Sequence, residues 1–250
     1  MTSAVGLAGK SAFVTGGARR IGRAIALALA RAGADVAISY HASQSEAAQT
    51  AADIASLGRR SLAIECDVRS ESSVRAAVGE VAGSFGRLDV LVNNAAIFGS
   101  AAVESLTLDQ WDAAFETNAR GPFLVAREAL PHLRAARGRI INMGSLGGIR
   151  AWAGHAHYCA SKAALHMLTQ AMAKAFAPEV SVNCVAPGWI DLDDSSGGAD
   201  RTQAARFAAK TPMGRNGSAA DVAQAVVFFA TGPHFITGQI LAIDGGLALA

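Results

Sequence analysis

The sequence has few cysteines, few aromatic residues and almost no excess of either charge. Its 3 cysteines form no Cys-x-x-Cys pair, which argues against a disulfide scaffold or a zinc ribbon and favours a reducing compartment. A net charge of +2 creates no long-range field toward nucleic acid or an anionic membrane surface. We therefore expect neither nucleic acid nor a membrane as a partner.

Long apolar runs are absent as well. The sequence holds no uninterrupted apolar stretch of about 18 residues, and its first residues, MTSAVG, lack the basic and apolar regions of a secretory signal. No shift in composition marks a domain boundary, and only 6 prolines occur. These features predict a cytoplasmic protein with a single domain, residues 1–250.

The sequence contains many aliphatic residues, which lie in alternating segments. Hydrophobic residues make up 51% and aromatic residues only 6%. Short β-branched runs alternate with longer alanine-rich runs, which is typical of parallel strands buried between two layers of helices. We predict an α/β fold with a doubly wound, seven-stranded, mostly parallel sheet and helices on both faces. The strands are predicted at 11–15, 35–39, 61–65, 88–92, 139–143, 181–185 and 239–243.

The longer runs between these strands predict helices, and one segment departs from the alternation. Residues 191–217 are polar and follow the Pro187-Gly188 turn, so we predict an irregular substrate loop at about 189–217. A solvated surface loop is the alternative. The helices are predicted at 20–32, 43–57, 70–84, 108–134 with a bend near Gly121, 157–177 and 218–230.

A glycine-rich turn follows the first predicted strand. Residues 15–22 have the sequence TGGARRIG, and a helix that begins at Arg20 would direct its free N–H groups toward an anion. Glycine clusters also occur in ordinary strand-to-helix turns, so the position after the first strand is what favours a pyrophosphate site. The candidate residues are Gly16, Arg19, Arg20, Ile21 and Gly22.

The end of the second predicted strand indicates which dinucleotide binds. NAD-binding proteins usually place a carboxylate there, but this chain has Tyr40, His41 and Ser43. With Arg19 and Arg20 on the facing loop, these residues favour the 2′-phosphate of NADP(H) over NAD(H). A solvated helix start is the alternative for the arginines, although two cations there oppose the helix dipole unless an anion binds.

A Tyr-x-x-x-Lys pair lies in the predicted helix 157–177. Residues i and i+4 share a helix face, so Tyr158 and Lys162 stand on the same side. A neighbouring ammonium lowers the pKa of a phenol from about 10, and the phenol could then protonate an oxygen while a hydride reaches its carbon. Ser145 could bind the same oxygen. Alone, such a pair is more often an ordinary surface pair.

Together these motifs resemble a short-chain dehydrogenase/reductase of the ketoreductase type, similar to 3-oxoacyl-acyl-carrier-protein reductases. The resemblance covers essentially the full length and implies a Rossmann-type fold, with residues 1–250 as one dinucleotide-binding and catalytic domain. It rests on TG at 15–16 with IG at 21–22, CDV at 66–68, NNA at 93–95, Asn118, Ser145, Tyr158, Lys162, PG at 187–188, TGQ at 237–239 and DGG at 244–246.

The resemblance implies a role for each matching residue. Tyr158 would be the acid/base, Lys162 would lower its pKa and bind the nicotinamide ribose, and Ser145 would position the substrate oxygen. Asn118 would hold, through its backbone, a water on a proton path from Lys162. The remaining implied cofactor contacts are Asp67 and Val68 at the adenine, Asn94 and Ala95 at the ribose, and Pro187, Gly188 and Ile190 at the nicotinamide. A turn and a helix cap are the alternatives for Asn94 and Asp67.

Three positions depart from the family's commonest pattern. Arg20 replaces a glycine. A subset of the family similar to bacterial ketoreductases and pteridine reductases has arginine at this position together with a Tyr-His-x-Ser motif, which is present here at residues 40–43. The shared pattern supports NADPH as the cofactor. Pteridine reductases carry an aspartate where this chain has Ser145. Leu192 stands where many members have a threonine that binds the nicotinamide carboxamide.

Several side chains are candidates for the substrate site, with core packing as the alternative. His155 and His157 lack a third ligand at a suitable spacing, so we expect no metal. The predicted pocket residues are His155, Trp152, Phe98, Leu146 and Trp189.

The leading hypothesis is an NADPH-dependent carbonyl reductase that acts on a small-molecule ketone or alcohol. The sequence does not distinguish a 3-oxoacyl thioester, quinone, sugar, steroid, pterin or imine substrate. The alternatives are a pteridine or imine reductase of the same family, a non-catalytic NADP(H)-sensing protein and a purely structural oligomer. Family members are commonly tetramers, so we predict a homotetramer, or else a dimer. It would use the tail 245–250 and the apolar stripe Leu165, Leu168, Met172 and Phe176, for which a core-facing position is the alternative.

Overall fold

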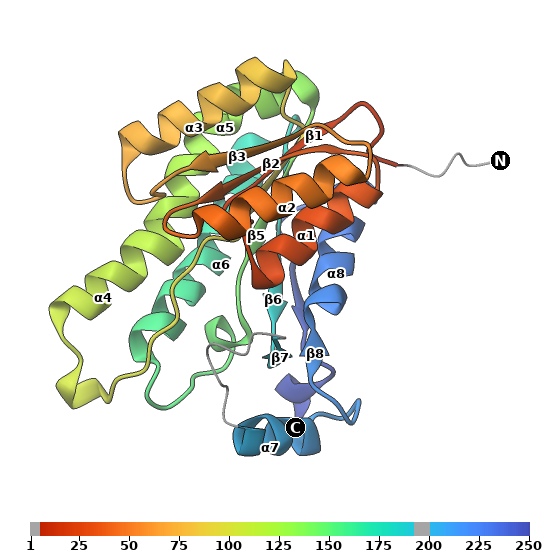
Figure 1. Ribbon diagram of the computed structural model, residues 1–250. Helices are drawn as coiled ribbons and strands as arrows, with labels where there is room; N and C mark the ends of the chain where they lie inside the picture. The colour runs from red at the N-terminus through yellow and green to blue at the C-terminus, as the bar shows by residue number, and fades with distance from the viewer. Residues whose placement is uncertain (1–5, 193–200) are drawn as a thin grey trace.

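The computed structural model describes residues 6–192 and 201–250 and contains one large parallel sheet (Figure 1). Its strand order is β3-β2-β1-β4-β5-β6-β9, and every neighbouring pair is parallel. The order runs outward from β1 in both directions, so the predicted doubly wound, Rossmann-type sheet is confirmed. The strands are β1 (Ser11–Val14), β2 (Asp35–Tyr40), β3 (Ser61–Glu65), β4 (Val90–Asn93), β5 (Arg139–Met143), β6 (Ser181–Pro187) and β9 (Ile240–Ile243).

The strand side chains divide between two hydrophobic cores, one on each face of the sheet. Successive side chains of a strand point to opposite faces, and β1 follows this pattern. Ala12 and Val14 belong to one core, whereas Phe13 belongs to the other. Both faces are therefore buried, which explains why the strands are apolar throughout rather than alternating with polar residues.

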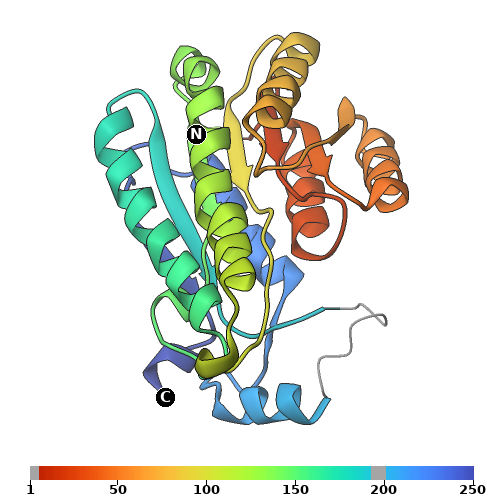
Figure 2. The same ribbon diagram turned by 90° about the vertical axis from the view of Figure 1, so that its left-hand side faces the viewer.

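Three helices cover each face. The core that contains Val14 includes residues of α1 (Arg20–Arg31), α2 (Gln44–Ser56) and α8 (Ala219–Thr231). The opposite core includes residues of α3 (Glu71–Phe85), α5 (Gly121–Ala136) and α6 (Ala156–Phe176). Figure 2 shows the helices of this second face toward the viewer.

The apolar stripe of α6 faces the core and not a partner. Leu165 and Met172 are buried, and Leu168 and Phe176 pack against the core below them. The core-facing alternative for this stripe is therefore confirmed, because its spacing seats α6 on the sheet. The exposed apolar side chain of α6 is instead Met167.

The segment 108–134, predicted as one or two helices, is two α-helices joined by a π-helical turn. α4 (Leu108–Phe115) begins at a capping box of Thr107 and Gln110, and the π turn Glu116–Arg120 leads directly into α5. Single π turns within helices are frequent at functional sites. This one contains Asn118, one of the predicted site residues.

The segment 189–217 is more regular than predicted. It contains helix α7 (Arg201–Lys210) and a two-stranded pair of β7 (Ile190–Asp191) and β8 (Gly217–Ser218). Residues 202–210, TQAARFAAK, are rich in helix formers, a signal that the polar composition of the segment concealed. Residues 193–200 lie outside the described part of the chain. The 3-10 turns are Val103–Ser105, Leu146–Gly148 and Leu247–Leu249.

The helices that the structure describes are too short or too polar to cross a membrane.

Candidate active site

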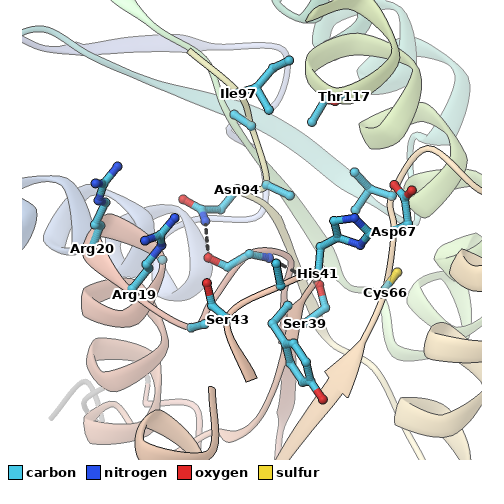
Figure 3. Close-up of a pocket in the computed structure, with 18 of the residues that line it drawn as sticks. Arg19, Arg20, Ser39, His41, Ser43, Cys66, Asp67, Asn94, Ile97 and Thr117 are labelled. Carbon is cyan, nitrogen blue, oxygen red and sulfur yellow. Dashed lines mark hydrogen bonds between the residues drawn. The ribbon is translucent and has the colours of Figure 1, made fainter. Parts of the chain in front are cut away.

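The first predicted site element is the turn between β1 and α1, which meets the end of β4 where the strand order reverses. Asn94 Nδ2 donates hydrogen bonds to the Thr15 carbonyl at 3.0 Å and to the Gly16 carbonyl at 2.9 Å (Figure 3). The backbone N–H groups of Asn94 and Ala95 both donate to Thr15 Oγ1 at 3.0 Å. Crevices at such reversal points are the usual ligand sites of open α/β sheets.

Two glycines allow this turn to form. Gly16 has a φ of +62°, which L side chains rarely adopt. At Gly22, in the first turn of α1, a Cβ atom would lie 2.2 Å from the Gly16 carbonyl oxygen and 2.6 Å from Asn94 Nδ2. The start of α1 is therefore pressed against the turn, and its N-terminal end is directed at the crevice as an anion site requires.

A cavity of about 500 Å³ lies in this crevice. The predicted cofactor residues of the turn, the second strand end, the Asp67-Val68 pair and the Asn94-Ala95 pair all line it. The wall consists of Gly16, Ala18, Arg19, Arg20, Ile21, Gly22, Ser39, Tyr40, His41, Ala42, Ser43, Cys66, Asp67, Val68, Arg69, Asn94, Ala95, Ala96, Ile97, Ala113, Thr117 and Leu192. Pro187, Gly188, Ile190, Tyr158 and Lys162 are not among these wall residues.

The cationic side of the cavity contains both arginines of the turn. Arg19, Arg20 and Ser43 lie on one side, whereas His41 lies near Asp67 on the other (Figure 3). Arg20 has a φ of +53°, the left-handed conformation that favours glycine. Arg20 therefore combines a backbone conformation typical of glycine with a cationic side chain.

Asp67 is the one acidic residue among the described residues of the cavity wall, and it is ion-paired. The Arg69 guanidinium donates to both its carboxylate oxygens, with Nε 2.9 Å from Oδ1 and Nη2 2.8 Å from Oδ2. These hydrogen bonds lower the pKa of Asp67 to about 2. Sequence analysis missed Arg69, although its position two residues after Asp67 was visible.

Tyr158, Ser145 and Lys162 come together at the carboxyl end of β5. Tyr158 and Lys162 share a face of α6, and Lys162 Nζ lies 5.8 Å from the centroid of the Tyr158 ring. Lys162 Nζ donates to the carbonyl of Met143, the last residue of β5, at 2.8 Å. Ser145 Oγ accepts the Gly147 N–H at 3.0 Å and is hydrogen-bonded to Tyr158.

Burial dominates the acidity of this cluster. Loss of solvent raises the pKa of Tyr158, and the Ser145 hydrogen bond only partly opposes it. The lowering of this pKa by Lys162 stays a prediction, since the Lys162 ammonium donates its hydrogen bond to the Met143 carbonyl. Burial also lowers the pKa of Lys162 to about 8.

Asn118 fastens the loop after β4 to α6. Its fully buried amide accepts the Ile97 N–H at 2.9 Å and donates to the Ile97 carbonyl at 3.0 Å. It also donates to Ser161 Oγ, on α6, at 3.0 Å. The side chain thus positions both the cavity wall at Ile97 and the helix that carries Tyr158.

The predicted pocket residues divide into two groups. Phe98 and Trp152 contact the Tyr158 ring, and His155 contacts both of them, as described below. Leu146 is buried in the core, which was the alternative to its pocket role. The Trp189 ring stacks on the Phe207 ring with centroids 4.3 Å apart. Within residues 6–192 and 201–250, no group of three His, Cys, Asp or Glu side chains is arranged to hold a metal ion.

Comparison with known proteins places these features in context. Residues 16–248 match a family model described as enoyl-(acyl carrier protein) reductase. A 3-oxoacyl-[acyl-carrier-protein] reductase of Staphylococcus aureus is 38% identical over 95% of this chain and 98% of its own length.

Two solved structures share the architecture over nearly the whole chain. A short-chain dehydrogenase of Burkholderia cenocepacia, solved in complex with NADP, is 44% identical with a TM-score of 0.90, covering 98% of this chain and 99% of its own. A putative short-chain alcohol dehydrogenase of Sinorhizobium meliloti has a TM-score of 0.93 at 33% identity, covering 99% and 100%.

Proposed function

The chain belongs to the short-chain dehydrogenase/reductase family, and we propose that it is an NADPH-dependent carbonyl reductase with Tyr158 as general acid. It is an oxidoreductase similar to 3-oxoacyl-acyl-carrier-protein reductases. The observation that carries the finer proposal is the cluster of Tyr158, Ser145 and Lys162 next to Phe98, which directly follows Ile97 of the cavity wall.

The cavity fits a dinucleotide on three counts. At Gly22 a side chain would fill the space where the turn approaches α1. The first residues of α1, residues 20–22, line the cavity, and the free N–H groups of a helix start favour a pyrophosphate. The one acid of the described wall, Asp67, is neutralised by Arg69, so the cavity offers an anionic ligand no uncompensated negative charge.

The wall residues suggest how the cofactor would be held. Residues 16–22 would contact the pyrophosphate, with Arg19, Arg20, His41 and Ser43 at the 2′-phosphate and Tyr40 beside them. The remaining proposed contacts are Asp67 and Val68 at the adenine, Asn94 and Ala95 at the ribose, and Pro187, Gly188, Ile190, Tyr158 and Lys162 toward the nicotinamide. NADPH, when bound, supplies a hydride to the carbonyl carbon.

The protein's own contribution would be to bind the carbonyl oxygen and give it a proton. Ser145 and Tyr158 would donate hydrogen bonds to the oxygen, and Tyr158 would release its proton as negative charge develops there. Lys162, whose pKa is about 8, is mainly ammonium at neutral pH and would stabilise the phenolate. Asn118 would fix the loop and the helix relative to each other and, through its backbone, hold the proton path.

A fluorescence titration tests the cofactor preference. We expect NADPH to bind at least tenfold more tightly than NADH, because the cavity offers cations and lacks a free acid. Arg19→Ala should reduce that preference more than His41→Ala, because His41 lies toward Asp67 and not beside Arg19. Arg31→Ala, at the distant end of α1, is the matched control. A preference for NADH, or equal effects of Arg19→Ala and Arg31→Ala, would contradict the NADPH assignment.

Turnover tests the enzyme itself. Tyr158→Phe should bind NADPH as tightly as wild type but reduce no diketone, because it keeps the ring and loses the proton donor. A general acid contributes about 10² to 10⁴ in rate, so residual activity near the wild-type value would overturn the assignment. A protein that binds NADPH without turning over any ketone, pterin or imine would support the sensing alternative.

We further propose that the chain acts as one domain with a substrate loop at about 189–217, in the cytoplasm and as a homotetramer, with a dimer as the alternative. Met167 on α6 and Leu249 near the C-terminus are exposed apolar side chains available for subunit contact. Sedimentation that gave a monomer at micromolar concentration would contradict the oligomer.

A further inference from the structure

Phe98 is an exposed aromatic side chain beside the proposed general acid. It is 61% exposed, although it directly follows Ile97 of the cavity wall. Its ring meets the Tyr158 ring edge-on, with centroids 4.8 Å apart and an interplanar angle of 87°. Exposed aromatic rings next to a reactive group are typical ligand contacts, since they bring a large apolar surface at little cost in side-chain entropy.

Two further rings complete an aromatic group around Tyr158. His155 stacks on Phe98 at 4.7 Å with an angle of 22°. The Trp152 ring is nearly parallel to the Tyr158 ring, at 23° and 6.5 Å, and nearly perpendicular to His155, at 79° and 6.1 Å. Phe98, Trp152 and His155 are here called the aromatic wall. Phe98 and Trp152 approach the phenol ring from different directions, and His155 contacts both of them.

The aromatic wall is held in place by the backbone. His155 Nδ1 lies 2.8 Å from the Gly99 carbonyl oxygen, and a carbonyl only accepts, so Nδ1 carries the proton. The Ala101 N–H donates to the Gly154 carbonyl at 2.9 Å. These two bonds join the loop that carries Phe98 to the loop that carries Trp152 and His155, so the rings are preorganised.

We propose that the aromatic wall makes this enzyme selective for planar, conjugated carbonyl compounds such as aryl ketones and aryl diketones. The inference rests on the proposed reductase function and names its substrate class. In the step, the carbonyl carbon takes a hydride from NADPH, which becomes NADP⁺, and the oxygen takes the Tyr158 proton, giving an alcohol. A flat aromatic substrate stacks on the aromatic wall and has few rotatable bonds that binding would fix. A flexible acyl chain makes no ring contact and loses rotational freedom when it binds.

A matched pair of substrates tests this selectivity. 1-Phenyl-1,2-propanedione and 2,3-hexanedione present the same reacting group with and without a ring. We expect wild type to have a kcat/KM at least tenfold higher for the phenyl compound. Phe98→Leu should lower this ratio by about two- to tenfold, because an aromatic contact contributes about 0.5–1.5 kcal/mol beyond its buried area. Phe98→Tyr keeps the ring and should keep the ratio.

Phe235→Leu is the control, because Phe235 is 99% exposed and follows α8 far from Tyr158 in sequence. Two results would overturn the aromatic selectivity and leave the reductase function intact. One is equal or better turnover of the hexanedione or of an acetoacetyl thioester. The other is the same ratio of kcat/KM values for the two diketones in Phe98→Leu and Phe235→Leu. Failure to reduce any of the three probes, with NADPH bound, would overturn the proposed function and this inference together.

Discussion

His166 lies beneath the loop that carries Ser145, and its Nε2 accepts a long hydrogen bond of 3.4 Å from the Ser145 N–H. The loop fits closely over the ring, since a Cβ at Gly144 would lie 2.3 Å from Nε2 and one at Gly148 would lie 2.6 Å from Cε1. Lys162 stands one helical turn away. His166 is therefore a positioning residue for Ser145, and its ring must be neutral to accept this bond.

Low pH should weaken the contact between His166 and the Ser145 loop and reduce the stability of the fold. Burial first, and then the charge of Lys162, lower the pKa of His166 to about 4 from its ordinary 6.5. Between these values the unfolded chain binds the proton and the folded chain does not, so stability present above pH 6.5 is lost as the pH falls toward 4. The free energy of unfolding falls by at most about 3 kcal/mol, since one pKa unit corresponds to about 1.36 kcal/mol. Urea unfolding at pH 7, 5.5 and 4.5 measures it.

His166→Gln provides the comparison for this pH dependence. It keeps an acceptor near the Ser145 N–H but cannot take up a proton in this range. Carboxylates such as Asp67 titrate in both proteins, so the difference between wild type and variant isolates the histidine. Parallel unfolding curves at the three pH values would show that His166 does not contribute this pH dependence.

The Tyr158 phenol should titrate above its ordinary value in the free protein, because burial raises its pKa. The chain has 2 tyrosines, so a Tyr40→Phe background leaves Tyr158 as the one phenol to follow by phenolate absorbance. Adding Ser145→Ala should raise the pKa further, because the Ser145 hydrogen bond lowers it. A midpoint below about 10 in the free protein would mean that Lys162 already governs the phenol.

Arg20 combines backbone strain with charge, and one substitution separates them. A non-glycine residue in the left-handed region costs about 1 kcal/mol relative to glycine, and Arg20 has a φ of +53°. Arg20→Gly should therefore leave the free energy of unfolding unchanged or raise it by up to about 1 kcal/mol, while it weakens NADPH binding. Arg20→Ala keeps the strain and loses the cation, so it should bind NADPH equally weakly without the gain in stability. Unchanged NADPH affinity in both would exclude Arg20 from the phosphate site.

Most of the sheet could be predicted because the sequence features that indicate its strands and turns are local. The apolar runs that predicted β3 and β5 match the observed strands, and the turn at 15–22 occupies the expected place. Helix α7 and the pair β7–β8 were missed because a polar, aspartate-rich segment around them suggested a loop. The direction of the α6 stripe could not be predicted, since a core face and a subunit face have the same helical spacing.

The site residues that sequence analysis missed depend on contacts between distant segments. His166 shares the helix face of Lys162, at i+4, but its function comes from the Ser145 loop 21 positions away in sequence. The buried chain from Asn93 through Asn142 to Thr169, with hydrogen bonds of 2.9 Å at each step, likewise links three elements. Such partners become visible only when the sheet has been assembled.

The approach of α1 to the first turn gives the sharpest packing prediction. At Gly22 a methyl group would lie 2.2 Å from the Gly16 carbonyl oxygen, so Gly22→Ala must displace the turn or the helix. Overpacking of this kind costs about 1–3 kcal/mol, and the displaced turn should also lose NADPH affinity. Gly79→Ala, in the exposed middle of α3 with nothing within 4 Å, should instead stabilise by about 0.5–1 kcal/mol and bind NADPH as wild type does. Urea unfolding and cofactor titration of the two variants measure both effects, and wild-type behaviour of Gly22→Ala would show that the helix start is not held against the turn.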